Sequence, residues 1–268
     1  MFAIANSHVY VAGICCALLL GAVALAPAAG ADSTNTGTAH FVARAQEIYS
    51  TAHKRFESEP TNTVAAWEFA RATFDRAEFA TNDTERATLA VQGIAACREA
   101  LARDAKSAPA HYYLGMNLGQ LARTKTLGAL KLVGEMEREF KAARGLDERF
   151  DFAGADRNLG LLYLEAPGWP ASIGSRSKAR HHLHRAAELY PQYPENRLCL
   201  LEAYLDWGDR NDAQDELKDI TKLWPTARKS LVGEAWTPTW TDWEKRLSQA
   251  KNKLEKLTNA PVSPRWRD

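Results

Sequence analysis

The sequence lacks the short motifs that identify common enzyme families. It contains no Gly-x-Ser-x-Gly nucleophile motif and no Gly-x4-Gly-Lys-Ser/Thr phosphate-binding loop. Acidic residues such as Asp147, Glu148 and Asp151 lie in a predicted turn between helices, where solvation accounts for them. We therefore expect a protein that is not an enzyme and that uses no cofactor.

An excess of charge of one sign is also lacking. The chain has 34 Lys and Arg residues against 33 Asp and Glu residues, a formal net charge of +1. Binding to nucleic acid relies on a basic stripe that neutralises phosphates, and no such stripe stands out. Nucleic acid is therefore excluded as the expected partner.

Cysteine is scarce, with four residues in 268, and Cys15 and Cys16 fall in an N-terminal apolar run. The remaining Cys97 and Cys199 lie on different predicted helix pairs. A disulfide needs Cα atoms within about 7 Å, so we expect two separate buried thiols. A bridge stays open as the alternative, because an oxidising compartment would permit one.

The N-terminus has the pattern of an export signal. Residues 9–26 are apolar, and Ala29-Gly30-Ala31 follows as a small-x-small run suited to signal peptidase. We expect a signal peptide over 1–31 and a periplasmic or secreted protein. No Lys or Arg precedes the apolar run, so an uncleaved membrane anchor is the alternative, and the only expected membrane contact.

A spacing of 34 residues, the length of a tetratricopeptide (TPR) repeat, recurs in the second half of the chain. It relates Ala179 to Ala213, Leu183 to Leu217 and Pro191 to Pro225. In such a repeat a small residue lets two helices approach closely, and proline ends the second helix. One helix pair cannot bury its own apolar face, so pairs stack into a solenoid.

Earlier copies of the repeat are recognisable by their first helix. The spacings between them exceed the ideal period by 11 and 7 residues, which indicates insertions. The copies are Trp67-x2-Ala70-Arg71-x2-Phe74, His111-x2-Leu114-Gly115-x2-Leu118, Asp156-x2-Leu159-Gly160-x2-Tyr163 and Arg197-x2-Leu200-Leu201-x2-Tyr204. The sequence thus predicts an all-α fold, a TPR-like helix-turn-helix solenoid of about four pairs with N- and C-terminal capping helices.

This pattern predicts ten helices and four segments of chain. The helices are expected over 38–57, 62–80, 83–104, 109–124, 128–146, 153–165, 175–190, 195–207, 210–223 and 241–258. The segments are a signal peptide (1–31), an N-terminal helix and linker (32–61), the repeat array (62–225), and a Trp-rich loop, capping helix and loose tail (226–268).

Two features are expected to start and to pack the last helix. Thr241-Asp242-Trp243-Glu244 has the spacing of a capping box before it. Trp236, Trp240 and Trp243 are expected to be core residues that cap the final repeat, with a separate ligand platform as the alternative.

The region 67–223 resembles the T-component (TatT) family associated with TRAP-type transporters. The resemblance is carried by 110–119, by Leu159-Gly160-Leu161-Leu162-Tyr163 with the following Ala166-Pro167-Gly168-Trp169-Pro170, and by 179–197. It implies a helical periplasmic protein that associates with a solute-binding protein. The best-known type of that family is a lipoprotein, and this chain lacks a lipobox.

The first helices of TPR pairs line a concave face, which is the usual binding surface. Positions five and nine of each repeat point there by helical spacing. They give the candidate partner-binding residues Glu68, Tyr112, Met116, Arg157, Leu161, Leu198 and Glu202. The alternative is that the insertions close the concave side and that these residues pack.

Two further features are candidate sites. The first is the insertion 166–174, which carries Trp169 between two prolines. Trp169 is either a contact site for a partner or folds back over the gap that the insertion creates. His181 and His184 have the spacing of metal ligands on a helix, but a third ligand is missing, so we expect a solvated basic face and no metal.

Three functions follow from these patterns. The first is an exported protein–protein interaction scaffold, serving a periplasmic solute transport system as the resemblance implies. The second is a carrier of a small apolar or amphipathic ligand, and the third is an envelope assembly factor. Self-association is left open.

Overall fold

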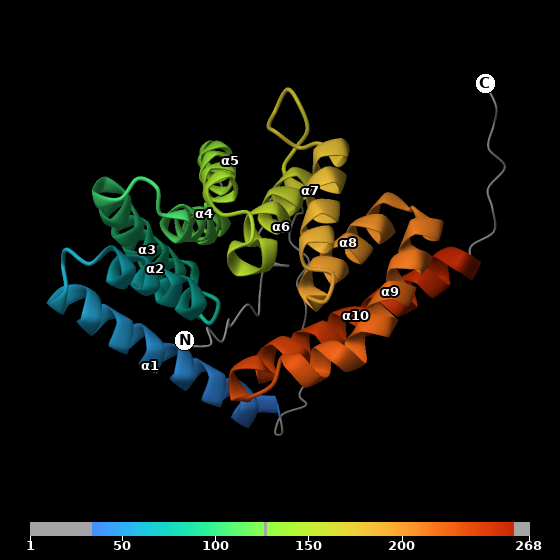
Figure 1. Ribbon diagram of the computed structural model, residues 1–268, viewed down its shortest axis with the longest axis horizontal. Coiled ribbons are helices and arrows are strands. Elements are labelled where there is room, and N and C mark those ends of the chain that lie inside the picture. The colour runs from blue at the N-terminus through green and yellow to red at the C-terminus, as the bar shows by residue number, and fades with distance from the viewer. Residues whose placement is uncertain (1–33, 126–127, 260–268) are drawn as a thin grey trace. The chain divides into compact units, whose positions relative to one another are not determined.

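The computed structural model describes residues 34–125 and 128–259. These residues form ten α-helices and one short 3₁₀ helix, and within them the only β-type pairing is an isolated bridge between Gly168 and Gly174 (Figure 1). The predicted all-α class is confirmed. The predicted signal peptide (1–31) and the predicted loose tail (260–268) lie outside the described residues.

The described chain divides into two compact units, residues 34–182 and residues 183–259. Their boundary lies within α7 (Arg176–Leu189). The segment boundaries expected at 61 and 225 stay predictions.

Six helices and the first part of α7 make up the unit formed by residues 34–182. Each of α2, α4 and α5 packs against the helix that follows it, and α3 packs against α4 as well as α2. The helices are α1 (Thr34–Ser58), α2 (Thr63–Ala77), α3 (Asp83–Arg103), α4 (Ala108–Arg123), α5 (Ala129–Leu146) and α6 (Phe150–Glu165).

Local signals in the sequence set the starts of these helices. The side chain of Asn82 accepts a 2.9 Å hydrogen bond from the backbone N–H of Glu85, and the Glu85 carboxylate accepts one from the N–H of Thr81. Pro109 lies in the first turn of α4, where its missing N–H costs nothing. The helix starts predicted at 83 and 109 therefore agree with the structure to within a residue.

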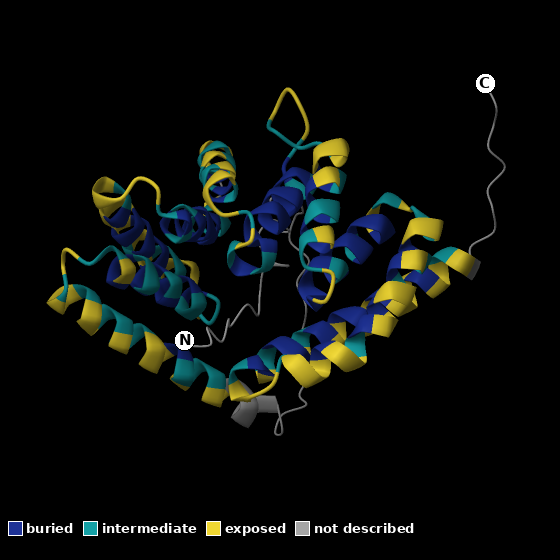
Figure 2. Cartoon of the chain, viewed as in Figure 1, coloured by how far each residue is buried: buried dark blue, intermediate teal, exposed yellow. Residues whose placement is uncertain are grey.

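The small residue of the repeat lets α4 and α5 approach closely, as predicted. A Cβ atom added to Gly115 would lie 2.6 Å from the ring of Phe140, a distance that real Cβ atoms do not tolerate. Gly93 similarly brings α3 against α4, because a Cβ there would lie 2.4 Å from Asn117 Oδ1. These contacts leave α4 buried from Tyr112 to Gln120 (Figure 2).

The second unit contains the remainder of α7 and three further α-helices, α8 (Pro194–Trp207), α9 (Arg210–Ser230) and α10 (Thr237–Asn259). The helices α8 and α9 pack together, and α10 packs against both. Gly208 ends α8 with φ of +72°, the left-handed conformation that glycine adopts readily. The short 3₁₀ helix η1 (Glu234–Trp236) precedes α10.

The prediction that Pro225 ends a helix and opens a long loop was wrong. Pro225 lies inside α9, which continues to Ser230. Residues on both sides of the proline pack on α10: the Trp224 ring lies 5.4 Å from the Trp240 ring, and the Arg228 guanidinium lies 4.2 Å above the Trp240 ring. These contacts stabilise helical backbone beyond the proline.

The start of α10 also differs from the prediction. It begins at Thr237, so Thr241 is inside the helix and its hydroxyl donates to Thr237 O rather than capping. The tryptophans were predicted correctly, because Trp236, Trp240 and Trp243 are all buried. The ring of Trp243 lies 4.9 Å from the ring of Trp240 in an edge-to-face arrangement. This aromatic contact is part of the core of the second unit.

Candidate interaction surface

The loop between α6 and α7 presents a large apolar side chain to solvent. This loop is the insertion predicted at 166–174, and it extends beyond the helices that it joins (Figure 1). The side chain of Trp169 is 89% exposed, the highest value among the exposed large hydrophobic residues of the described chain. The alternative in which Trp169 folds back over a gap was therefore wrong.

Backbone hydrogen bonds within the loop fix its shape. Gly174 N donates to Pro167 O at 2.9 Å, and the N–H groups of Ala171 and Ser172 both donate to Gly168 O. The two ends of the loop cross closely, since a Cβ on Gly174 would lie 2.0 Å from Ala166 O. The tryptophan is thus carried by a loop of defined conformation, which lowers the entropy lost when a partner binds.

Tyr163 of α6 anchors the base of the loop. Its carbonyl accepts a 2.9 Å hydrogen bond from Ser175 N, and its hydroxyl donates to Glu137 Oε1 at 2.5 Å. Lys141 donates to the same carboxylate at 2.6 Å. Burial and the bond to Glu137 raise the pKa of Tyr163, and the bond to Glu137 raises the pKa of Lys141. The base of the loop is therefore held by Tyr163 of α6, whose hydroxyl is bonded to the Glu137–Lys141 ion pair of α5.

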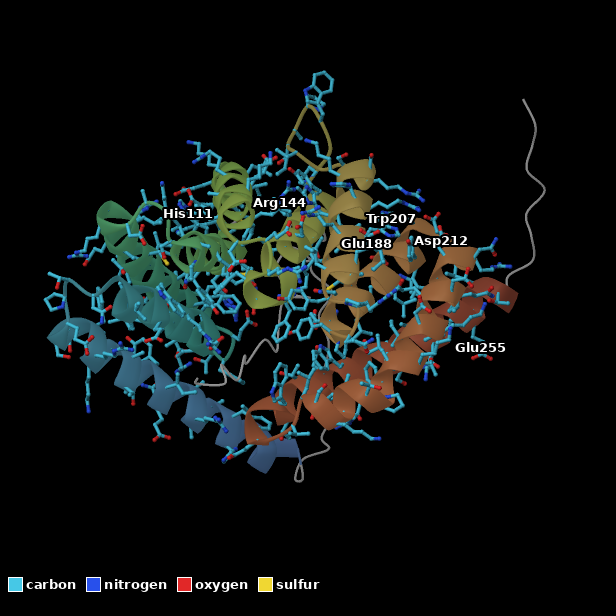
Figure 3. The ribbon with its side chains drawn as sticks, viewed as in Figure 1. His111, Arg144, Glu188, Trp207, Asp212 and Glu255 are labelled. Atoms are coloured by element: carbon cyan, nitrogen blue, oxygen red, sulfur yellow. The ribbon has the colours of Figure 1, made fainter. Side chains whose placement is uncertain are left out.

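A second polar contact ties α7 to α6. The ring of His182 lies 2.7 Å from Asp156 Oδ1 through Nδ1, and it stacks on the ring of Tyr163 at 5.5 Å. Arg144 of α5, labelled in Figure 3, approaches the same carboxylate at 3.7 Å. Asp156 is fully buried, so these two partners offset the cost of burying its charge.

The three neighbouring histidines were expected on a solvated face, but they do not all lie there. His182 is buried, whereas His181 is exposed. His184 contacts the hydroxyl of Tyr204 through Nε2 at 2.5 Å. No group of three His, Cys, Asp or Glu side chains in the described residues is arranged to hold a metal ion.

The helix that follows the loop is rich in cations. No acidic residue occurs between Glu165 and Glu188. Three basic side chains there are exposed, those of Arg176, Lys178 and His181. Lys178 lies at the foot of the loop, because its Nζ is 5.0 Å from the centre of the Tyr163 ring. We call the loop 167–174 together with these three side chains the Trp169 surface.

Most of the residues predicted to line a concave binding face lie in the interior. Tyr112, Met116, Arg157 and Leu198 are fully buried, and Leu161 is 9% exposed. The expectation that these residues face an open groove was wrong. The alternative, in which they pack inside the protein, is correct for these five residues. Helical spacing gives the direction of a side chain but does not show what covers it.

The two predicted glutamates are partly exposed and already paired within the chain. Glu68 accepts a hydrogen bond from Arg55, and Glu202 accepts two from Arg246 at 2.8 and 2.9 Å. Of the predicted partner-binding residues, Trp169 alone is both largely exposed and placed on a loop.

Sequence reasoning missed a buried polar network at the start of α6. Asp151 was expected in solvent, but its carboxylate accepts hydrogen bonds from the Tyr112 hydroxyl at 2.5 Å and from Arg157 Nη2 at 2.9 Å. Asn158 donates to the Tyr112 hydroxyl at 3.1 Å. The local sequence carries no signal for this network, because Asp151 and Tyr112 are 39 residues apart.

The backbone of this network is strained. Asp151, Phe152 and Ala153 have φ of +54°, +53° and +61°. The left-handed conformation costs roughly 1–2 kcal/mol for each residue with a Cβ. The surrounding hydrogen bonds hold the turn in place, so the network is a structural element of this unit.

Two further expectations can be compared with the structure. Cys97 and Cys199 are both buried and neither is in a disulfide, as predicted. Burial raises the pKa of the Cys97 thiol, which makes it unreactive. Among the described helices, none has the length and apolar character needed to cross a bilayer.

Comparison with known proteins supports the fold. Residues 34–130 match the family of Regulator of microtubule dynamics protein 1-3. A thermophilic TPR protein of Thermus thermophilus, TTC0263, aligns with a TM-score of 0.59 and 17% identity, covering 82% of this chain and 96% of its own. This likeness confirms the predicted TPR-like fold.

Two further solved structures align less closely. MamA has a TM-score of 0.48 and 17% identity, over 74% of this chain and 98% of its own. YrrB, a TPR protein with an unusual peptide-binding site, has a TM-score of 0.45 and 15% identity, over 77% and 91%. No curated protein matches the sequence significantly. None of these matches supports the resemblance to the T-component family.

Proposed function

We propose that this chain is a protein–protein interaction scaffold that binds its partner through the Trp169 surface. The observation that carries the proposal is the indole of Trp169, 89% exposed on a loop of fixed backbone. Tryptophan is enriched among the residues that contribute most to binding energy, because it fills a pocket and excludes water. The TPR-like helix pairs supply a rigid support for the loop.

The proposal also covers the location of the scaffold and the class of its partner. The apolar run at 9–26, with the small residues after it, supports an exported protein. The stretches that resemble the T-component family support a periplasmic solute-binding protein as the partner. The chain would then act as an accessory of a solute transport system, without catalysing a reaction.

A second candidate rests on the match to the family of regulators of microtubule dynamics. That match covers α1 to α4 and ends before the Trp169 surface begins. A role shared with that family would therefore depend on the first four helices. Substituting Trp169 would leave such a role intact, which separates the two candidates.

The proposal is tested by affinity purification of the full chain from its own organism, followed by quantitative mass spectrometry of the proteins that remain bound. Trp169→Ala is compared with Val232→Ala, which removes an exposed apolar side chain from the other unit. We expect Trp169→Ala to lose the partner and Val232→Ala to retain it. A partner that binds the two variants equally would overturn the proposal.

A further inference from the structure

We infer that the partner presents carboxylates around the pocket that receives the indole of Trp169. This inference rests on the proposed function and adds the chemistry of the partner to it. Its basis is the distribution of charge around the loop, which differs from that of the chain as a whole. The whole chain is nearly neutral, with a net charge of +1.

The charge beside the loop is positive and lies on one element. Between Glu165 and Glu188 the chain carries Arg176, Lys178, Arg180 and Arg185 and no carboxylate. With both flanking glutamates included, four cations and two anions leave a net charge of +2 over these 24 residues, histidines counted as neutral. These cations beside the foot of the loop, called the cationic rim below, are complementary to an acidic partner.

Lys178 is positioned to make the central contact of this rim. Its backbone N–H donates to Ser175 Oγ at 3.3 Å, which places it in the first turn of α7. Its Nζ lies over the ring of Tyr163, the residue that anchors the loop. His181 follows Lys178 by about one helical turn on the same face. Arg176 lies in the same first turn of α7, on a different face. Cationic side chains therefore lie beside the base of the loop that carries Trp169.

The carboxylates of Glu137 and Asp156 already have partners within the chain, and Lys178 is one of the cations that act on Glu137. Glu137 is already bonded by Lys141 and by the Tyr163 hydroxyl. Although burial opposes it, these bonds lower the pKa of Glu137, so it stays ionised and paired. Asp156 is fully buried between His182 and Arg144. An acidic partner would meet the exposed side chains of Arg176 and Lys178.

A folded protein fits this surface better than a lipid bilayer. Adsorption to a membrane scales with the apolar area that enters it. Trp169 is the single large apolar side chain exposed on the loop, because Ile173 is half-buried. One indole with a cationic rim is the pattern of an anchor residue surrounded by polar contacts at a protein interface.

Carbodiimide coupling of the purified complex tests the inference directly. The reagent joins a lysine amine to a carboxylate as an amide, and takes up the released water to become a urea. We expect a cross-linked peptide that joins Lys178 to an Asp or Glu of the partner. Lys178→Arg keeps the charge but cannot form the stable amide, so this variant should bind the partner and lose the cross-link.

Charge reversal supplies the matching affinity measurement. Lys178→Glu should weaken partner binding about fivefold or more in low salt, and the difference should shrink in high salt as the charges are screened. Lys131→Glu makes the same change at an exposed position of α5 and should bind like the unmodified chain. Circular dichroism melts of both variants check that they fold.

The outcomes separate the inference from the proposed function. If Trp169→Ala still binds the partner, the proposed function fails. If Trp169→Ala loses the partner while Lys178→Glu binds normally and no cross-link forms, the acidic partner is disproved and the interaction site stands. Trp169-dependent sedimentation with phosphatidylglycerol vesicles, without a protein partner, would overturn both and assign the surface to lipid.

Discussion

The hydroxyl of Tyr112 donates a 2.5 Å hydrogen bond to the carboxylate of Asp151, and this bond joins the middle of α4 to the left-handed turn at the start of α6. Arg157 completes the contact from the next turns of α6. Burial and the neighbouring Asp151 raise the pKa of Tyr112, which stays protonated and keeps donating. The network holds strained backbone that the local sequence would not adopt alone.

Removing the charge of Asp151 should therefore destabilise the protein strongly. Asp151→Ala leaves the buried Arg157 guanidinium without its counter-charge, which costs about 3–5 kcal/mol. Tyr112→Phe removes one hydrogen bond and should cost about 1–2 kcal/mol. Urea denaturation measures both variants. An Asp151→Ala midpoint equal to that of the unmodified chain would show that the network does not support the turn.

Stability should fall as pH rises through the range set by Glu78. Burial raises the pKa of Glu78 from 4.5 to about 7, although Arg123 and Gln120 oppose this. The folded state then binds more protons than the unfolded state between these values. The free energy of unfolding therefore decreases from pH 4.5 to 7 and levels off above it.

Glu78→Gln isolates this effect, because the amide does not titrate. Its stability relative to the unmodified chain should improve by about 2 kcal/mol between pH 5 and pH 8. Urea unfolding at several pH values provides the measurement. Parallel stability curves for the two proteins would contradict the assignment to Glu78.

Two helical glycines should respond to alanine in opposite ways. At Gly115 a Cβ would meet the Phe140 ring at 2.6 Å, so Gly115→Ala should destabilise by about 1–3 kcal/mol through overpacking. A Cβ at Gly134 would meet nothing within 4 Å beyond the backbone of its own helix. Gly134→Ala should therefore stabilise α5 by about 0.5–1 kcal/mol. Thermal unfolding of the two variants provides the measurement. If both substitutions changed the stability in the same direction, the close approach of α4 and α5 would be refuted.

Two tryptophans should separate binding from stability. Trp169→Ala removes an exposed side chain and should change the free energy of unfolding by less than about 0.5 kcal/mol while abolishing partner binding. Trp243→Ala empties a fully buried site and should cost about 3–5 kcal/mol. Denaturant unfolding and a partner-binding assay are measured for both variants. An equal loss of stability in the two variants would show that Trp169 has a structural role.

The shape of the loop is tested at Gly174. Gly174→Ala would bring a Cβ within 2.0 Å of Ala166 O, a backbone atom that cannot move freely, so the loop must change conformation. We expect weaker partner binding although Trp169 is intact, with the helices unaffected by circular dichroism. Affinity equal to that of the unmodified chain would mean that the loop conformation contributes nothing to binding.

The helices could be predicted from sequence because their signals are local. Asn82 caps α3, Pro109 and Pro194 lie in first turns, and Gly208 ends α8. The continuation of α9 past Pro225 could not be predicted, since it depends on the packing of Trp224 and Arg228 against Trp240 of another helix. Tertiary contact there outweighs the local preference of proline.

The site was harder to predict for a related reason. The repeat pattern gave the direction of Tyr112 and Met116, but their burial depends on neighbours that the pattern does not identify. Asp151 looked solvated because its partner Tyr112 is distant in sequence. Trp169 was a candidate because an aromatic residue between prolines in an insertion is unusual by itself, and its exposure agrees with one of the two alternatives for this loop. A signal for the cationic rim was present in the run 176–185, which has no acidic residue.

The position of the Trp169 loop has a consequence for how this protein can change over evolutionary time. The loop occupies an insertion where the repeat period is lengthened by seven residues, and it leaves and rejoins the helices at one crossing point. In a solenoid each repeat contacts mainly its neighbours, so a change at the tip of such a loop does not propagate through the array. Mutations at 168–173 can therefore accumulate while the helical framework that supports the loop stays the same, so a partner bound there could be exchanged without refolding the protein.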